Sequence, residues 1–231
     1  MSECSVRIEN FPTIGFPHMV IRVRERAIET KVKDDALVKQ RREEIIRAAS
    51  QVFTQKGYHG ATIRDICEAS GLGPGTLYNY VEKKEDILYL VYNELTLMLT
   101  QCLVDTVREN KKNPLEQFHE ALEKTIDIIW NYQDLVLLMY HETASLDRES
   151  KHTILTRESD YVALWDKLLA RCEKLGMIPR RNPLDSNILV FLLAFLPLRR
   201  WNLKNKFREA EIKSGIIDHV VRSIGISKRT R

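Results

Sequence analysis

The chain has 231 residues, of which 44% are hydrophobic and 29% charged, which is typical of a globular protein large enough to bury a sizeable core. Its formal net charge of +4, from 36 Lys and Arg against 32 Asp and Glu, permits a nucleic-acid partner without requiring one. The scattered Cys4, Cys67, Cys102 and Cys172 argue against a disulfide framework or zinc site, and the longest apolar run, residues 188–198, is shorter than the roughly 20 residues that cross a bilayer.

Residues 1–36 lack periodicity, because Pro12, Gly15 and Pro17 interrupt it, and we interpret them as a flexible N-terminal arm. Two readings of the basic stretch 20–26 stay open. In the first, it has no function, either because it is a frayed tail or because the start is assigned too early and Met19 is the first residue. In the second, it is an arm that reaches into a DNA minor groove. The chain shows no signal peptide, so we expect a cytoplasmic protein that does not contact membranes.

From Ala36 onward the spacing of apolar residues predicts helices almost throughout, and therefore an all-α fold without strands. Gly57 is placed to end the first helix, Thr62 and Asp65 form a capping box for the second, and Pro74 begins the third. Pro197 is expected to kink or end the helix that contains it. The predicted helices cover residues 36–57, 62–70, 74–81, 84–108, 114–131, 133–146, 150–175, 183–197 and 208–224.

The second and third predicted helices, joined by Gly71-Leu72-Gly73, have the layout of a helix-turn-helix. In that motif the second helix lies in the major groove and its first turn faces the base edges. Here that turn consists of small residues, which let the backbone come close to DNA, and of Thr76, which can bond a base or a phosphate. Because neither Pro74 nor Gly75 has a hydrogen-bonding side chain, readout is expected to use Thr76, Arg64 and DNA shape.

Three stretches together resemble the DNA-binding domain of the tetracycline-repressor (TetR) family: residues 57–66, residues 71–80 with Gly-Thr-Leu-Tyr at 75–78, and Lys-Glu-Asp at 84–86. The resemblance covers about residues 38–90. It implies phosphate contacts from Thr62, Tyr78, Tyr80 and Lys84, and base-facing roles for Pro74, Gly75 and Thr76. Three residues depart from the family pattern: Val81 replaces an aromatic, Lys83 replaces the Ser that caps the fourth helix, and Cys67 replaces Ala. The first two predict looser packing and weaker capping there.

The second half carries no catalytic motif, no metal-binding spacing among its histidines and no phosphate-binding glycine loop, so we expect no enzyme, cofactor or metal. Its aromatic residues together suit a helical domain that encloses an apolar pocket, although for any one of them a place in the core is the better explanation. The candidate effector-binding residues are Trp130, Tyr140, Tyr161, Trp165, Phe191, Phe195 and Arg199.

The family resemblance further implies an effector pocket between the fourth and eighth helices, and a homodimer formed through the last two long helices, here residues 185–196 and 212–224. Residues 140–146 and 198–202 are similar to the branch that senses fatty acyl-CoA, and the cations at 199, 200, 204 and 206 could meet phosphates. A solvated helix end explains that basic cluster equally well.

We therefore predict three parts: the arm at 1–36, a helix-turn-helix domain at 37–88, and a ligand-binding and dimerisation domain at 89–231. The predicted function is a ligand-responsive repressor that binds double-stranded operator DNA and is released by a small apolar effector such as a fatty acyl-CoA. Two alternatives remain: an architectural DNA-binding protein without an effector, and a helical small-molecule-binding protein.

Overall fold

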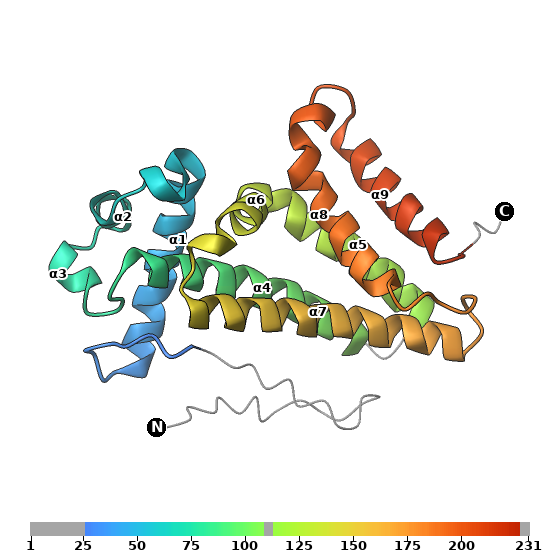
Figure 1. Cartoon of the computed structure of the whole chain (residues 1–231), viewed down its shortest axis with the longest axis horizontal. Coiled ribbons are helices and arrows are strands. Elements are labelled where there is room, and N and C mark those ends of the chain that lie inside the picture. Colours follow the sequence, from blue (N-terminus) through green and yellow to red (C-terminus); the bar gives the residue numbers. More distant parts are fainter. Residues whose placement is uncertain (1–25, 109–112, 227–231) are drawn as a thin grey trace. The chain divides into compact units, whose positions relative to one another are not determined.

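The computed structural model describes residues 26–108 and 113–226, and all regular structure in these ranges is helical (Figure 1). The chain forms two compact units. Within the described residues, the first unit runs to Thr96 and also includes Leu138–Arg157, and the second comprises Leu97–Leu137 and the residues from Glu158 onward. The expected all-α fold is confirmed.

Three helices at the start of the first unit begin and end where local chemistry requires. Helix α1 (Asp35–Gly60) is capped by Asp34, and Gly57 interrupts it at φ 71°, a conformation that glycine adopts without strain. Helix α2 (Ile63–Ser70) opens with the predicted Thr62–Asp65 capping box. Helix α3 (Pro74–Leu77) is shorter than expected, because the chain turns from Tyr78 instead of continuing as a helix.

Helix α4 (Lys84–Arg108) is capped from inside its own first turn. The Asp86 carboxylate accepts hydrogen bonds from the backbone N–H groups of Glu82 (3.0 Å) and Lys83 (3.1 Å), and so replaces the cap that Lys83 itself cannot provide. Val81 is 1% exposed, so the looser packing expected around it is not seen. Among the described residues, α4 is long and apolar enough to cross a membrane by composition, but more than half of that stretch is buried in the protein, as in a core helix.

Residues 26–33 run across the first unit as a strap, although the sequence had assigned them to a flexible arm. The Arg26 guanidinium bonds the Asp86 carboxylate at 2.8 Å and the Ser150 hydroxyl at 3.0 Å, and lies 3.4 Å from Asp147. Ile28 is buried at 7% exposure. This anchoring fixes the strap at its start; residues 1–25, including most of the basic stretch, lie outside the described residues.

Further along the strap, two hydrogen bonds reach a backbone carbonyl in the turn that follows α3. The Lys31 N–H and the Thr30 hydroxyl both donate to the Asn79 carbonyl, at 3.0 and 2.9 Å. The Arg42 guanidinium of α1 then donates to the carbonyls of Ile28 and Tyr80, and so joins strap, α1 and this turn. The strap therefore holds one end of the predicted recognition element.

Three helices pass from one unit to the other as continuous chain: α4, α6 (Gln133–Glu142) and α7 (Arg148–Lys174). A 3₁₀ turn at Thr143–Ser145 follows α6 and shortens the helix predicted to reach residue 146. The sequence had placed one boundary between residues 88 and 89; the compact units instead divide these helices internally.

The second unit packs α5 (Pro114–Asn131), α8 (Asp185–Leu203) and α9 (Glu209–Ser223) against one another (Figure 1). The sequence predicted that Pro197 would kink or end α8. The helix does not end there, because it continues to Leu203. A proline removes a single N–H donor from the helix, and burial of Pro197 and of Leu196 beside it offsets that loss.

Replacing Arg26 by Met should lower the free energy of unfolding by about 3 kcal/mol, because Asp86 is 1% exposed and would lose its cation while staying buried. Urea unfolding followed by circular dichroism measures this. The matched control is Glu149→Gln, since Glu149 also faces Arg26 but at 4.0 Å and 73% exposed; its effect should stay below about 0.5 kcal/mol. Equal losses in the two variants would contradict a stabilising role for the buried pair.

Candidate functional site

The first turn of α3 presents its residues outward. Gly73, Pro74, Gly75 and Thr76 are all exposed, while Leu77 is fully buried and holds the short helix on its unit. The backbone N–H of Thr76 bonds the Gly73 carbonyl at 2.9 Å, which closes the turn. The structure therefore displays as a group the residues for which the sequence predicted base-facing roles.

The glycines of this turn are not required by the fold. A Cβ added at Gly73 or Gly75 would meet nothing within 4 Å, and neither residue has a positive φ. In a helix, Gly costs about 0.5–1 kcal/mol relative to Ala, so Gly75 is a local disadvantage without an internal reason. Without a Cβ at either position, the backbone of this turn stays accessible to another molecule.

The start of α2 offers a second exposed surface, with Thr62 and Arg64 both accessible. The Thr62 hydroxyl lies 2.8 Å from one Asp65 oxygen, and the Lys56 ammonium lies 2.6 Å from the other. Hydrogen bonds from Lys56 and Thr62 hold the pKa of the Asp65 carboxyl down at about 2, so the capping box is intact at physiological pH. Thr62 therefore orders the N-terminus of α2, and the free backbone N–H groups of this helix end are suited to bind a phosphate.

The two tyrosines expected to contact phosphate are placed differently. Tyr78 is 42% exposed and its hydroxyl can reach outward. Tyr80 is only 4% exposed, and its carbonyl accepts the Arg42 bonds described above. Of the two, Tyr78 is available for DNA in this conformation, whereas Tyr80 belongs to the core beneath the recognition turn.

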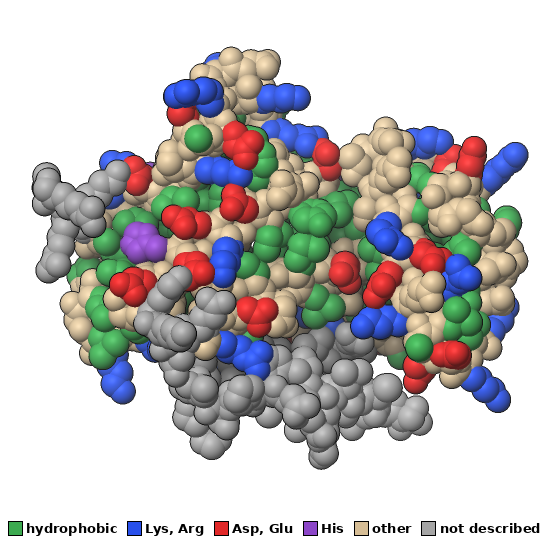
Figure 2. All heavy atoms as spheres, turned by 180° about the vertical axis from the view of Figure 1, so that it is seen from behind, with side chains coloured by type: hydrophobic (Ala, Val, Ile, Leu, Met, Phe, Trp, Pro, Cys, Tyr) green, Lys and Arg blue, Asp and Glu red, His purple; other side chains and the backbone are tan. Residues whose placement is uncertain are grey.

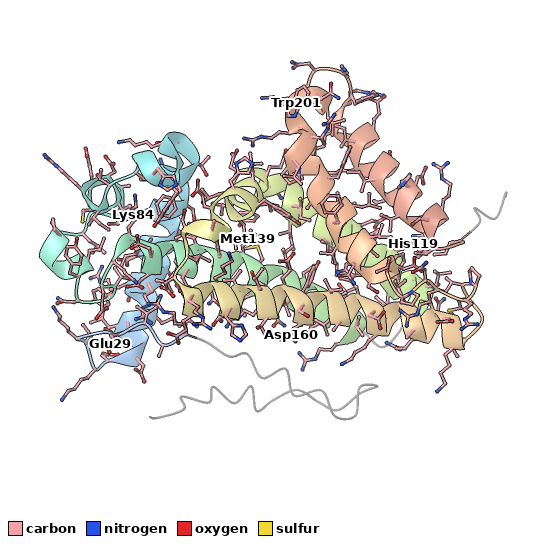
Figure 3. The ribbon with its side chains drawn as sticks, in the orientation of Figure 1. Glu29, Lys84, His119, Met139, Asp160 and Trp201 are labelled. Carbon is pink, nitrogen blue, oxygen red and sulfur yellow. The ribbon has the colours of Figure 1, made fainter. Side chains whose placement is uncertain are left out.

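Lys84, at the start of α4, makes contacts within the protein that the sequence did not predict (Figure 3). Its ammonium donates to the carbonyls of Tyr58 and Ala61, both at 2.9 Å, and lies 4.4 Å from the centre of the Tyr58 ring. The lysine thus satisfies carbonyls at the end of α1 and holds α1 against α4. An ammonium has three donors, so one remains for a phosphate.

A second link to the end of α1 comes from α6. His59 Nε2 lies 3.1 Å from a Glu142 oxygen, and the same oxygen accepts a hydrogen bond from the Ser145 hydroxyl at 2.8 Å. Deeper in the same unit, the Tyr92 hydroxyl donates to the Leu138 carbonyl. The last part of α6 is therefore held against the helices that support α3. No local sequence pattern predicts the contacts of His59 with Glu142 and of Tyr92 with Leu138, because the partners are 46 or more residues apart.

Positive and negative side chains are mixed on the face of the protein that Figure 2 shows. Lys and Arg side chains alternate there with Asp and Glu, as the net charge of +4 suggests. Binding to a polyanion would therefore depend on local contacts at α2 and α3 more than on a broad positive field.

The candidate effector residues fall into separate groups. Tyr161 and Trp165 lie together inside the second unit with ring centres 6.3 Å apart, and Phe118 packs on the other side of Trp165. Trp130 is covered by the Lys213 ammonium at 5.2 Å, and the Arg199 guanidinium stacks on exposed Trp201 at 5.1 Å, near the end of α8 (Figure 3). Tyr140 is 37% exposed on α6 in the first unit.

Phe191 and Phe195, which we had also grouped with the effector site, lie instead on an exposed apolar stripe of α8. The stripe has helical spacing, and its members are between 38% and 59% exposed. It consists of Leu184, the residue that precedes α8, and of Ile188, Phe191 and Phe195 within the helix. An apolar face of this kind is typical of an interface with another chain.

Two family models match the chain. Residues 45–89 match the model described as bacterial regulatory proteins of the tetR family, and residues 111–222 match the model described as a tetracyclin repressor-like C-terminal domain. Together they cover more than half of the chain. Among curated relatives, the HTH-type transcriptional regulator HbdR of Aromatoleum sp. (strain CIB) is 24% identical over 203 residues, covering 83% of this chain and 84% of the relative.

Solved structures share the fold. The fatty acid degradation regulator FadR from Bacillus halodurans superposes with a TM-score of 0.67 at 21% identity, covering 83% of this chain and 97% of that one. AibR, solved in complex with isovaleryl coenzyme A and operator DNA, has a TM-score of 0.65 at 20% identity, covering 78% of this chain and 97% of that one.

Substituting Gly75 by Ala should weaken binding to a specific DNA site about tenfold or more, because a methyl group would stand where the backbone must approach the bases. The melting temperature should stay the same or rise slightly, since the added methyl meets no atom of the protein and Ala favours the helix. Anisotropy titration and thermal melting of the same preparation separate the two effects. Unchanged DNA affinity would show that α3 does not meet DNA at this residue.

Proposed function

The chain belongs to the TetR family of transcriptional regulators, and on that premise we propose that it is a dimeric repressor whose grip on its operator is released by a small apolar effector. The family is one of DNA-binding regulators and not of enzymes. The observation that carries the proposal is the exposed first turn of α3. Its glycines have no role inside the protein, and it stands beside the accessible start of α2.

Specific readout is proposed to combine few side chains with close backbone approach. Thr76 offers a hydroxyl to a base edge, Pro74 offers an apolar surface to a thymine methyl, and Arg64 is exposed on the neighbouring helix. Tyr78 and the N-terminus of α2 at Thr62 are suited to phosphate oxygens. Such a surface supplies few direct hydrogen bonds to bases, which favours an operator recognised partly by its shape.

Dimerisation is proposed through the apolar stripe of α8 together with α9. An isologous interface puts the same stripe of two copies face to face, so the four exposed apolar side chains would cover one another. The second copy is the occupant with the best support, because an operator with two half-sites needs two recognition helices, and the family model that matches residues 111–222 includes α8 and nearly all of α9.

An acyl-CoA effector is supported by the relatives and by the composition of the second unit. One structural neighbour was solved with isovaleryl coenzyme A, and another is named as a fatty acid degradation regulator. The interior of the second unit is aromatic and aliphatic, as an acyl chain requires. The cations at the end of α8 are exposed, although Arg200 pairs with Asp134.

The release mechanism is proposed to use the three helices that belong to both units. Effector binding in the second unit would shift the equilibrium between two conformations of α4, α6 and α7. The first-unit parts of these helices hold Lys84 and Glu142 at contacts with the end of α1, and Ser150 at its contact with Arg26 of the strap. A coupling of about 1–3 kcal/mol would change operator affinity five- to 150-fold.

Two other functions predict different behaviour. An architectural DNA-binding protein would show little sequence preference and an affinity set almost wholly by salt. A helical small-molecule-binding protein would bind its ligand and ignore DNA. Both would retain the fold described above.

Fluorescence anisotropy on DNA from immediately upstream of the protein's own gene, at near-physiological salt and against scrambled competitor, tests the proposal. We expect competitor-resistant binding that palmitoyl-CoA weakens at least fivefold. Binding that is indifferent to palmitoyl-CoA would remove the effector class and leave the regulator. If selection from random DNA yields no preferred sequence, the specific repressor is wrong and the architectural alternative stands.

Replacing Phe191 by Glu should convert the dimer to monomers and weaken operator binding at least tenfold, because the added charge would be buried at the centre of the α8 stripe. Light scattering coupled to size exclusion reports the mass. Leu175→Glu is the control: Leu175 is 60% exposed, comparable to Phe191 at 58%, but follows the end of α7. A dimer that survives Phe191→Glu would place the interface elsewhere.

A further inference from the structure

Three polar side chains are buried together in the second unit without hydrogen bonds. Thr125 lies on α5, and Tyr161 and Trp165 lie one turn apart on α7; they are 0%, 6% and 0% exposed. Thr125 Oγ1, the Tyr161 hydroxyl and Trp165 Nε1 all lack a hydrogen-bond partner among the described residues. Buried polar atoms are normally paired, so a group of three requires an explanation.

The three groups are close neighbours. Burial raises the pKa of the Tyr161 hydroxyl to about 12, and the donor groups of Trp165 and Thr125 near its oxygen only partly oppose that rise. The two hydroxyls can accept as well as donate, whereas the indole N–H can only donate. An oxygen acceptor placed among the three could therefore accept a hydrogen bond from each of them.

The surroundings select the kind of acceptor. The same helices bury Leu122, Ile126, Leu168 and Leu169 at 2% exposure or less, so the cluster sits among hydrocarbon. Burial also raises the pKa of the Cys172 thiol, further along α7, to about 11, because desolvation disfavours the thiolate. A neutral oxygen acceptor with apolar groups on either side fits better than a carboxylate.

We propose that Thr125, Tyr161 and Trp165 form the polar end of the effector site and bind a neutral carbonyl oxygen, such as that of a thioester or an ester. The proposal rests on the proposed function for the existence of an effector, and adds the group by which the effector is recognised. Thr125 was not among the residues that the sequence singled out. The acyl chain of such a ligand would pack on the aromatic and aliphatic side chains around the cluster.

The first test needs no ligand. If the cluster is unpaired in the free protein, Thr125→Val and Tyr161→Phe remove buried polar atoms that cost stability, and each should raise the melting temperature by about 1–4 °C. Thr106→Val is the matched control: Thr106 is also fully buried in this unit, but its hydroxyl donates to the Cys102 carbonyl at 2.8 Å, so this change should not raise the melting temperature. Lower melting temperatures for Thr125→Val and Tyr161→Phe would mean that the cluster is satisfied, for example by a structural water, and would overturn the proposal.

The second test asks whether a carbonyl is recognised. Palmitoyl-CoA and methyl palmitate carry a neutral carbonyl, hexadecyl-CoA thioether lacks it, and palmitate carries a carboxylate. By calorimetry the wild-type protein should bind palmitoyl-CoA about tenfold more tightly than the thioether, and Tyr161→Phe should abolish that difference while leaving thioether binding unchanged. Methyl palmitate tells whether the coenzyme part is needed, and palmitate tests the preference for a neutral group.

The failure of this inference and that of the proposed function are distinguishable. The carbonyl site would be overturned if the wild-type protein bound the carbonyl-bearing and carbonyl-free probes equally well, or bound none of them. Specific binding of the same protein to operator DNA would still support the repressor. Conversely, wild-type protein that distinguishes the carbonyl-bearing from the carbonyl-free probes but shows no preferred DNA sequence would overturn the repressor and leave the carbonyl site standing.

Discussion

The buried carboxylate of Asp86 is the interaction on which the first unit depends. It caps α4 through two backbone N–H groups and accepts the Arg26 guanidinium that anchors the strap, at 1% exposure. Burying a carboxylate costs free energy of desolvation, which hydrogen bonds and a cation at its oxygens must offset, and these contacts supply both. Because Arg26 also meets Ser150 and Asp147, the same charge joins the start of α4 to the start of α7. The surface offered to DNA is thus supported by a polar network as well as by apolar packing.

The sequence predicted well whatever depends on neighbouring residues. The Thr62 capping box, the interruption at Gly57 and the proline at the start of α3 all follow from chemistry within four residues, and the structure has each of them. It could not predict that Lys84 would close the end of α1, because its partners are 23 and 26 residues away. The exposure of Phe191 also depends on which face of α8 turns inward, and periodicity alone does not decide this for a helix that is apolar on most sides.

The division into units bears on how a signal could travel. A boundary at residue 88 would leave α4 as the single link between DNA binding and effector binding, whereas the compact units cut α4, α6 and α7. The first-unit portions of these helices carry partners of Tyr58, His59 and Arg26, namely Lys84, Glu142 and Ser150. The contacts that support the end of α1 and the strap therefore lie on the three helices that continue into the second unit. The release mechanism proposed above accordingly has three covalent connections to use instead of one.

Three features of the chain violate a local rule and gain nothing inside it. Gly75 weakens a short helix where a larger residue would fit, the α8 stripe exposes four large apolar side chains, and the Thr125 cluster buries three polar groups that have no hydrogen-bond partner among the described residues. Natural sequences depart from such rules mainly at functional sites. Each departure suits a different kind of contact: backbone close to a grooved surface, hydrocarbon against hydrocarbon, and donors around an oxygen. The three partners proposed above, a nucleic acid, a second copy and an uncharged oxygen-bearing ligand, would each supply one of these contacts.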